Sequence, residues 1–230
     1  MNKEKFGLTG NALKIMAMVF MTVDHVGMMI FPNVLLLRII GRLAFPIFAY
    51  MIAEGCTYTK NRKKYLLTVL LFAVVCQIVY LVAMQSLYMC IFVTFSLSIV
   101  LIYTLDNAIK KKTVLAWILC AIAFAAVYFV ADVVPLKFNV GDFRIDGDFA
   151  GILVPVLIYL GRNKWQKLIL VAAALLLLSA THGWIQWYCL LALPLLFLYN
   201  GKRGTGKMKY LFYFYYPIHL VAIYFLSYVI

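Results

Sequence analysis

The chain has 230 residues, of which 66% are hydrophobic and only 13% are charged. A soluble domain is about 45 to 50% apolar and about 25% charged, so the composition excludes a water-soluble globular protein. The formal net charge is +13. A nucleic-acid partner is not expected, because basic loops on one side of a lipid bilayer account for such a charge by themselves.

Apolar runs separated by basic or turn-rich breaks predict an all-α fold, a polytopic membrane helical bundle with about nine transmembrane helices in a single domain, residues 1–230. The predicted spans are residues 11–31, 34–57, 65–84, 87–106, 113–134, 149–161, 167–181, 184–199 and 210–230. The sixth to eighth spans are short. A re-entrant hairpin is the alternative for them, but it would bring the basic residues of 162–167 into the membrane.

The basic residues fall mainly in the loops of one predicted side. These are Lys3, Lys5, Lys14, Lys60, Arg62, Lys63, Lys64, Lys110, Lys111, Lys112, Arg162, Lys164, Lys167, Lys202, Arg203, Lys207 and Lys209. The opposite loops contain Lys137 and Arg144 beside four aspartates. The positive-inside rule therefore predicts a cytoplasmic N-terminus and an external C-terminus.

Few ionisable residues remain within the predicted spans, and in a bilayer such residues are costly enough that each suggests a function. They are Asp24, His25, Arg38, Arg42, Glu54 and His219, with Lys14 at the cytoplasmic entry of the first span. The structural alternative is that Asp24 pairs with Arg38 or Arg42 and only holds two helices together.

Helical geometry aligns several of these side chains. Lys14 and His25 are eleven residues apart, or about three turns, so they share one helix face at an axial separation of about 16 Å. Asp24 lies on another face and is expected to meet a neighbouring helix, whereas Arg38 and Arg42 share a face. Counting the rise per residue from the predicted helix ends places His25, Arg42 and His219 at nearly the same depth.

The chemistry of these residue types is that of an anion site next to a base. Two guanidinium groups can bind carboxylate or phosphate oxygens, and a histidine can take and return a proton near neutral pH. Pro46 and Pro217 each remove a helical hydrogen bond, so we expect opened backbone near Arg42 and Tyr213 that lines a cavity; a packing kink is the alternative.

The remaining polar features are less informative. The acidic run at 142–148 lacks the register of a calcium loop, and no metal site is predicted. Asp146 or Asp148 is expected to cap the sixth helix, or to attract a cationic acceptor. The five cysteines lie in apolar runs without C-x-x-C spacing, so neither disulfides nor zinc are predicted.

Four segments resemble the TraX family, integral membrane proteins named after the F-pilin acetylase of conjugative plasmids. They are L-K-I-M-A-M-V-F-M-T-V-D-H-V-G (13–27), I-G-R-L-A-F-P-I-F-A-Y-M-I-A-E-G (40–55), T-K-N-R-K-K-Y (59–65) and F-Y-Y-P-I-H-L (214–220). The Lys14 to His25 spacing also resembles the Lys/Arg-x10-His signature of the acyltransferase type 3 superfamily, in which the histidine is held to be catalytic.

This resemblance implies a multi-pass acetyltransferase in the cytoplasmic membrane of a bacterium. It would move an acetyl group from acetyl-CoA to an acceptor amine or hydroxyl, on a protein N-terminus or a glycan, directly or through an acetyl-histidine. His25 would be the base, and an arginine would offset the charge that develops on the thioester oxygen. The resulting candidates are catalytic His25, Asp24 and Arg42; cofactor-binding Lys14, Arg38, Arg42, Arg62 and Lys63; and substrate-binding Glu54, Asp148 and His219.

A proton-coupled secondary transporter of a small anionic solute is the alternative function. Such carriers also place charged residues on broken helices near the midplane. The motifs of the first two spans have no counterpart in the second half of the sequence, so no inverted repeat supports a transporter. The enzyme is therefore the preferred prediction, with the lipid bilayer as surroundings and no signal for the oligomeric state.

Overall fold

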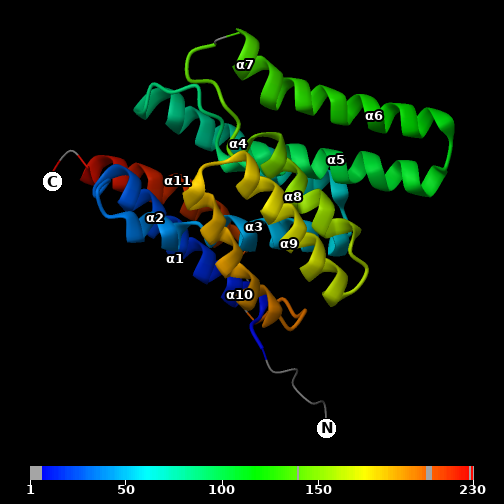
Figure 1. Ribbon diagram of the computed structural model, residues 1–230, viewed down its shortest axis with the longest axis horizontal. Helices are drawn as coiled ribbons and strands as arrows, with labels where there is room; N and C mark the ends of the chain where they lie inside the picture. The colour runs from blue at the N-terminus through cyan, green and yellow to red at the C-terminus, as the bar shows by residue number, and fades with distance from the viewer. Residues whose placement is uncertain (1–6, 139, 206–208, 228, 230) are drawn as a thin grey trace. The chain divides into compact units, whose positions relative to one another are not determined.

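The computed structural model describes residues 7–138, 140–205, 209–227 and 229. Within them the regular structure is helical, and extended pairing is limited to two isolated bridges, Leu8 with Tyr199 and Met89 with Ile145 (Figure 1). The all-α prediction is confirmed. Three of the basic residues used to orient the chain lie outside the described part, namely Lys3, Lys5 and Lys207.

The elements follow one another as α1 (Gly10–Met29), α2 (Leu35–Gly41), α3 (Ala44–Tyr58), α4 (Arg62–Ala83), α5 (Ile91–Lys111), α6 (Val114–Tyr128), η1 (Phe129–Val133), α7 (Val134–Phe138), α8 (Asp148–Leu160), α9 (Lys164–Thr181), η2 (Trp184–Ala192), α10 (Leu193–Phe197) and α11 (Lys209–Leu226). A π-helical turn, η1, joins α6 to α7, and a 3₁₀ helix, η2, continues into α10. The described residues therefore form nine helical segments, and each overlaps a predicted span.

Six of these segments are long and apolar enough to cross a membrane, whereas α8, η2 with α10, and α11 are shorter. The prediction of a short seventh span is wrong, because α9 begins at Lys164 and has 18 residues. Its start is fixed by Asn163, whose side chain accepts a hydrogen bond from the amide of Gln166 at 2.9 Å.

Polar residues in the breaks between the apolar runs begin several other helices in the same way. The Thr9 hydroxyl accepts from the amide of Ala12, and the Asn61 side chain accepts from the amide of Lys64. Such caps satisfy amides that have no partner inside the helix. The sequence thus sets the starts of α1, α4 and α9 locally.

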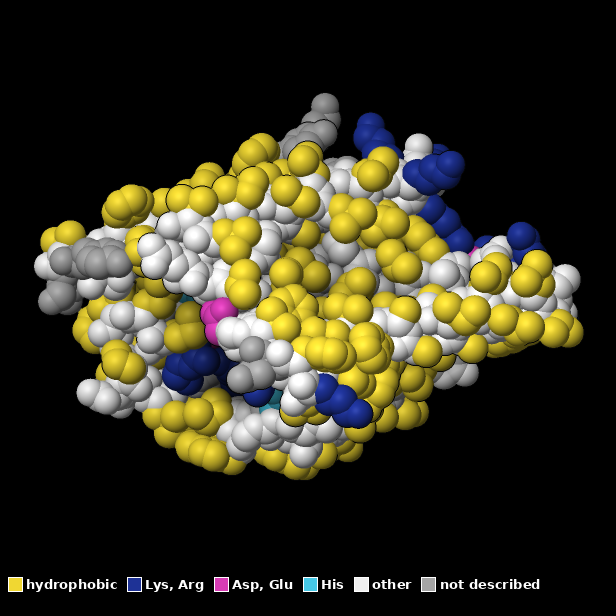
Figure 2. Space-filling model, turned by 90° about the horizontal axis from the view of Figure 1, so that it is seen from above, with side chains coloured by type: hydrophobic (Ala, Val, Ile, Leu, Met, Phe, Trp, Pro, Cys, Tyr) yellow, Lys and Arg dark blue, Asp and Glu magenta, His cyan; other side chains and the backbone are white. Residues whose placement is uncertain are grey.

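The surface of the long helices is apolar. On α4, five large side chains spaced three or four residues apart are exposed: Leu67, Leu71, Val74, Ile78 and Val82. Hydrophobic side chains also cover most of the face seen in Figure 2. A stripe of this kind would be unfavourable in water. It is the surface expected of a multi-pass membrane protein, in which lipid solvates the exposed face of each helix.

The chain divides into two compact units, one formed by residues up to 51 together with those from 163 onward, and the other by residues 52–162. In the first unit α1 packs against α2 and α11, and η2 packs against α2 and α9. In the second unit α5 lies against α4, α6 and α8. That the chain forms a single functional domain stays a prediction.

The two prolines singled out in the sequence behave differently. The helix is interrupted at Arg42 and Leu43, between α2 and α3, and Pro46 occupies the first turn of α3, where its missing amide is tolerated. The predicted break beside Arg42 is confirmed. By contrast, α11 continues through Pro217, so the break predicted near Tyr213 is wrong.

Candidate functional site

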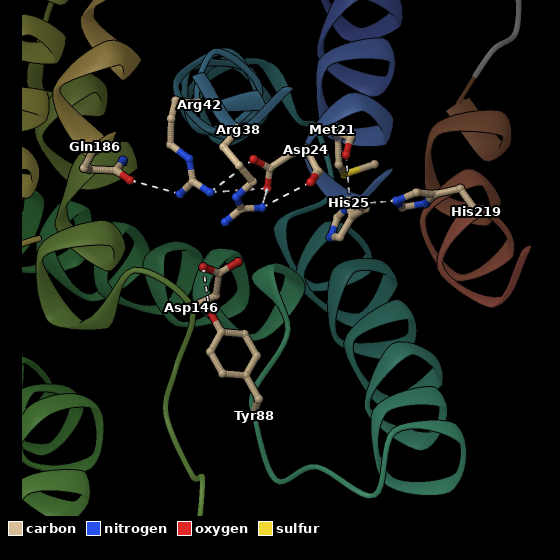
Figure 3. Close-up of polar contacts among 9 residues, drawn as sticks. All are labelled: Met21, Asp24, His25, Arg38, Arg42, Tyr88, Asp146, Gln186 and His219. Carbon is tan, nitrogen blue, oxygen red and sulfur yellow. Dashed lines mark hydrogen bonds and ion pairs between the residues drawn. The ribbon is translucent and has the colours of Figure 1, made fainter. Parts of the chain in front are cut away.

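The site is built around Asp24, which joins α1 to α2. Its carboxylate accepts a hydrogen bond from Nη1 of Arg38 at 2.8 Å and another from Nη2 of Arg42 at 3.1 Å (Figure 3). Arg38 also donates to the backbone carbonyl of Asp24 at 3.1 Å. As predicted, Asp24 faces a neighbouring helix and both arginines point the same way; the ion pairing considered as a structural alternative is also present.

Two glycines allow α1 and α2 to approach closely enough for this pairing. A Cβ atom on Gly41 would overlap the Asp24 side chain, and one on Gly27 would lie 2.6 Å from Cβ of Leu37. Both glycines belong to the D-H-V-G and I-G-R-L strings of the sequence. Their role is steric, since a methyl group at either position would force the helices apart.

Arg42 keeps hydrogen-bonding capacity beyond its contact with Asp24. Its Nη1 donates to Oε1 of Gln186 on η2 at 3.2 Å, while its Nε is buried and has no hydrogen-bond partner among the described residues. The Asp24 side chain is 18% exposed, and those of Arg38 and Arg42 are each 24% exposed. One acid and two guanidinium groups leave a net charge of +1, which suits the binding of an anionic group.

His25 follows Asp24 directly on α1 and contacts the other buried histidine. Its Nδ1 lies 2.9 Å from the carbonyl oxygen of Met21 and 3.1 Å from Nε2 of His219 on α11 (Figure 3). The depth estimate for the two histidines is therefore confirmed by a direct contact. Arg42 is linked to this pair indirectly, because it binds the carboxylate of Asp24, the residue that precedes His25.

Tyrosines on α11 fix the orientation of the His219 ring. The Tyr215 ring stacks on it with a centroid distance of 5.1 Å, and the Tyr216 ring lies edge-on to it at 5.3 Å. The Tyr215 hydroxyl in turn forms a hydrogen bond with the hydroxyl of Thr22 on α1. The histidine pair is thus held at a packed interface between α1 and α11.

Lys14 lies on the same side of α1. Its Nζ is 5.2 Å from the centre of the Phe212 ring on α11, the helix that also carries His219. Lys14 and His25 therefore face one partner helix, which confirms that the eleven-residue spacing puts both on one face.

The other predicted site residues belong to the second unit. Nη1 of Arg62 pairs with Oδ2 of Asp106 at 2.6 Å, while Lys63 is exposed in the first turn of α4. Glu54 is buried in α3, and Asp148 opens α8 with a φ of 50°. Of the predicted cofactor-binding residues in this unit, Arg62 thus already has an acidic partner.

The aspartates of the loops before α5 and α8 are engaged in local hydrogen bonds. Asp142 accepts from the Ser86 hydroxyl and, at 2.8 Å, from the amide of Leu87. These two donors hold the pKa of Asp142 below its usual value. Asp146 accepts from the Tyr88 hydroxyl at 3.0 Å, and burial together with this carboxylate raises the pKa of Tyr88.

The helix cap predicted for α8 is wrong. Asp132 in η1 accepts the hydrogen bond from the amide of Phe149 at 2.9 Å, whereas Asp146 is turned to Tyr88 and Gly147 occupies the cap position. Sequence spacing favoured the nearest acid. The structure uses an acid that is distant along the chain but adjacent in the fold.

Several contacting residues were not among the candidates named from the sequence. They are Gln186, Thr22, Tyr215, Gly41 and, in the second unit, Asp106. Gln186 carried a usable signal, since it is an amide within the apolar run W-I-Q-W. Asp106 was placed at the end of a span, but α5 continues to Lys111 and encloses it.

Comparison with known proteins supplies further context. The family described as TraX protein matches residues 9–227, a range that contains every residue of the site. The chain is 27% identical to the probable fimbrial assembly protein FimC, serogroup H1, of Dichelobacter nodosus, with 92% of each chain covered. A shorter stretch is 45% identical to the uncharacterized protein RP591 of Rickettsia prowazekii (strain Madrid E), over 16% of this chain and 15% of that one. No solved structure matches.

Proposed function

Because the chain belongs to the TraX family, we propose that it is a membrane acetyltransferase that moves an acetyl group from acetyl-CoA to an amine or hydroxyl. The observation that carries the proposal is the arrangement on α1. The ring of His25 is fixed by a hydrogen bond, and the preceding residue is an acid that forms ion pairs with two arginines. A base beside an anion site is what acyl transfer from a thioester requires.

In the proposed reaction the acceptor nitrogen or oxygen attacks the thioester carbonyl carbon while His25 takes its proton. The carbon–sulfur bond then breaks, and the thiolate of CoA recovers the proton from His25. Negative charge develops on the carbonyl oxygen of the thioester during the attack. Arg42 is the group proposed to stabilise it, because its buried Nε–H has no other partner among the described residues.

The proposed orientation puts the N-terminus in the cytoplasm of a bacterium, following the positive-inside rule. Lys14 would then lie near the inner end of α1 and His25 about 16 Å further out. Acetyl-CoA bound with its phosphates near Lys14 could extend its long pantetheine arm towards His25. The roles of Arg62 and Lys63 in cofactor binding, and of Glu54 and Asp148 in acceptor binding, stay predictions.

The acceptor class is suggested by the fimbrial assembly protein to which this chain is 27% identical. We propose a pilus subunit as acceptor, modified at its N-terminal amine or on a hydroxyl. An N-terminal amine has a pKa of about 7.7 to 8.0, so part of it is neutral at pH 7. A hydroxyl acceptor would depend more strongly on the base.

The test is direct transfer from labelled acetyl-CoA. The protein in lipid nanodiscs is incubated with labelled acetyl-CoA and with pilin peptides that have free or blocked N-termini, and products are identified by mass spectrometry. Label in the free peptide, absent with His25→Ala, supports the proposal. The proposal fails if neither these peptides nor a glycan added as an alternative acceptor is labelled. Accumulation of acetate or another small anion by the same protein in proteoliposomes would then identify a transporter.

The proposed topology is tested separately at α8, which has only 13 residues, or about 20 Å. In a cysteine-free background, single cysteines replace the exposed residues Arg144 before α8 and Lys164 after it. If α8 crosses the membrane with the proposed orientation, an impermeant reagent added to intact cells labels position 144 and spares position 164. Labelling at both positions would indicate a hairpin that returns to the outer side.

A further inference from the structure

Each of the two buried histidines forms a hydrogen bond with a backbone carbonyl of its own helix. Nδ1 of His25 lies 2.9 Å from the carbonyl oxygen of Met21, and Nδ1 of His219 lies 2.9 Å from the carbonyl oxygen of Tyr215. A carbonyl oxygen can only accept a hydrogen bond. Both contacts therefore require the hydrogen of the neutral ring to be on Nδ1.

This assignment leaves one arrangement for the contact between the rings. Nε2 of the neutral His219 has no hydrogen, so it accepts, and the Nδ1 hydrogen of His25 is shared between it and the Met21 carbonyl. A hydrogen on Nε2 of His219 would meet the hydrogen on Nδ1 of His25 at a nitrogen separation of 3.1 Å. The lone pair on Nε2 of His25 stays available, and no hydrogen bond engages that atom in the part of the chain that the structure describes.

We infer that His219 is a positioning residue, which together with the Met21 carbonyl holds His25 in the tautomer whose Nε2 acts as the base, and which stabilises the imidazolium that forms. This inference rests on the proposed function. When Nε2 of His25 takes the acceptor proton, Nδ1–H becomes a charged donor, and its hydrogen bond to Nε2 of His219 strengthens. The proton on Nε2 then passes to the thiolate of CoA, and the pair returns to its neutral state.

The surroundings explain why a second ring would be needed. The guanidinium groups of Arg38 and Arg42 lie on one side of His25 and His219 on the other (Figure 3). Two cations oppose a positive charge on His25, and Asp24, the acid that precedes it in the chain, is engaged by both of them. The rings of Tyr215 and Tyr216 also lie against the histidines and orient them. His219 is therefore the acceptor placed away from the arginines.

The proton arrangement can be observed without any assay of activity. The chain has three histidines, so protein labelled with ¹⁵N-histidine gives few ring signals, and His182→Asn leaves only the buried pair. At neutral pH we expect both buried rings to have a protonated Nδ1 and a bare Nε2, with a scalar coupling between Nδ1 of His25 and Nε2 of His219. A hydrogen on Nε2 of either ring would overturn the inference.

The functional part is tested by two substitutions of one residue. His219→Leu removes the acceptor and should lower kcat about tenfold or more, with the KM for acetyl-CoA unchanged. His219→Gln places an amide oxygen close to the position of Nε2 and should recover at least threefold over leucine. His182→Leu, at the end of α9, is the matched control and should retain wild-type kcat.

The outcomes separate this inference from the proposed function. Transfer that depends on His25 but is unaffected by His219→Leu refutes the positioning role and leaves the acetyltransferase standing. A rise in the acceptor KM with kcat unchanged would instead assign His219 to acceptor binding and also refute it. If the wild-type protein transfers nothing, the proposed function fails, and the scalar coupling in the ¹⁵N spectrum alone decides whether Nδ1–H of His25 is bonded to Nε2 of His219.

Discussion

Each of the two units contains a largely shielded acid that is bound by two cations, and the two groups are built differently. In the first unit Asp24 on α1 meets two arginines at the end of α2. In the second unit Asp106 on α5 meets Arg62 of α4 at 2.6 Å and a lysine one turn further along its own helix, Lys110, at 2.8 Å. Both arrangements hold neighbouring helices together.

What differs is the chemistry of the groups around the paired charges. Arg42 retains a buried Nε–H without a partner among the described residues, and the next residue after Asp24 is a histidine. All three histidines belong to the first unit, at positions 25, 182 and 219. A buried charge in a membrane protein suggests function by default, and a spare donor and a base beside Asp24 make it the stronger candidate of the two acids.

The sharpest test of this contrast removes the base. His25→Ala should lower single-turnover acetyl transfer by 10²- to 10⁴-fold, the range typical of general-base catalysis. Binding of acetyl-CoA should persist, since its phosphates are proposed to lie near Lys14. Both quantities are measured on the same nanodisc preparation. Transfer within a fewfold of wild type would make His25 a packing residue and remove the distinction between the two units.

Arg42→Lys asks whether the spare guanidinium donor matters. Lysine keeps the charge but lacks the planar guanidinium, whose several N–H groups can bind Asp24, Gln186 and the proposed thioester oxygen at the same time. We expect a loss of about tenfold or more in kcat, because an arginine at such a site is not replaced by a point charge. Arg144→Lys, in an exposed loop, is the control. Full activity of Arg42→Lys would reduce the role of Arg42 to charge alone.

Gly41→Ala tests the close approach that brings Asp24 to the arginines. The added methyl group would overlap the Asp24 side chain, so α1 and α2 must separate. Overpacking of this kind typically costs about 1 to 3 kcal/mol, and we expect a lower unfolding midpoint together with a severalfold loss of transfer. Gly183→Ala is the matched control, because its Cβ would meet no atom within 4 Å. Equal behaviour of the two variants would contradict the steric argument.

Much of the fold could be predicted from the sequence, because helix length, apolar periodicity and capping act locally. The nine segments, the pairing face of Arg38 and Arg42, and the face shared by Lys14 and His25 all follow from helical repeats. The contacts of Gln186, Tyr215 and Asp132 could not be predicted in this way. They join residues that are distant along the chain, and their partners are decided by how the helices pack.

Asp106→Asn probes the acid of the second unit. It weakens two ion pairs of a buried carboxylate, where hydrogen bonds to charged groups contribute about 1.5 to 3 kcal/mol. A chain of this size loses about 2 to 4 °C in unfolding midpoint per kcal/mol, so a drop of several degrees is expected. The kcat of transfer should stay within about twofold of wild type. A loss of kcat as large as that of Arg42→Lys would show that the second acid also serves the reaction.

The smallest expected effect is at Asp142, whose two hydrogen bonds from Ser86 and Leu87 lower its pKa. A carboxyl with a depressed folded pKa stabilises the folded state above its unfolded value of about 3.9, and this contribution is lost as the pH falls through the folded pKa. Exchange protection of the Leu87 amide should therefore be steady near pH 6 and decline as the pH falls below about 4. Asp142→Asn should abolish this pH dependence while leaving acetyl transfer unchanged, since the carboxylate is already engaged by its own loops. Protection that stays flat down to pH 3 would show that the ionised form is not what holds these loops together. Lost transfer in Asp142→Asn would show that this loop carboxylate also serves the reaction.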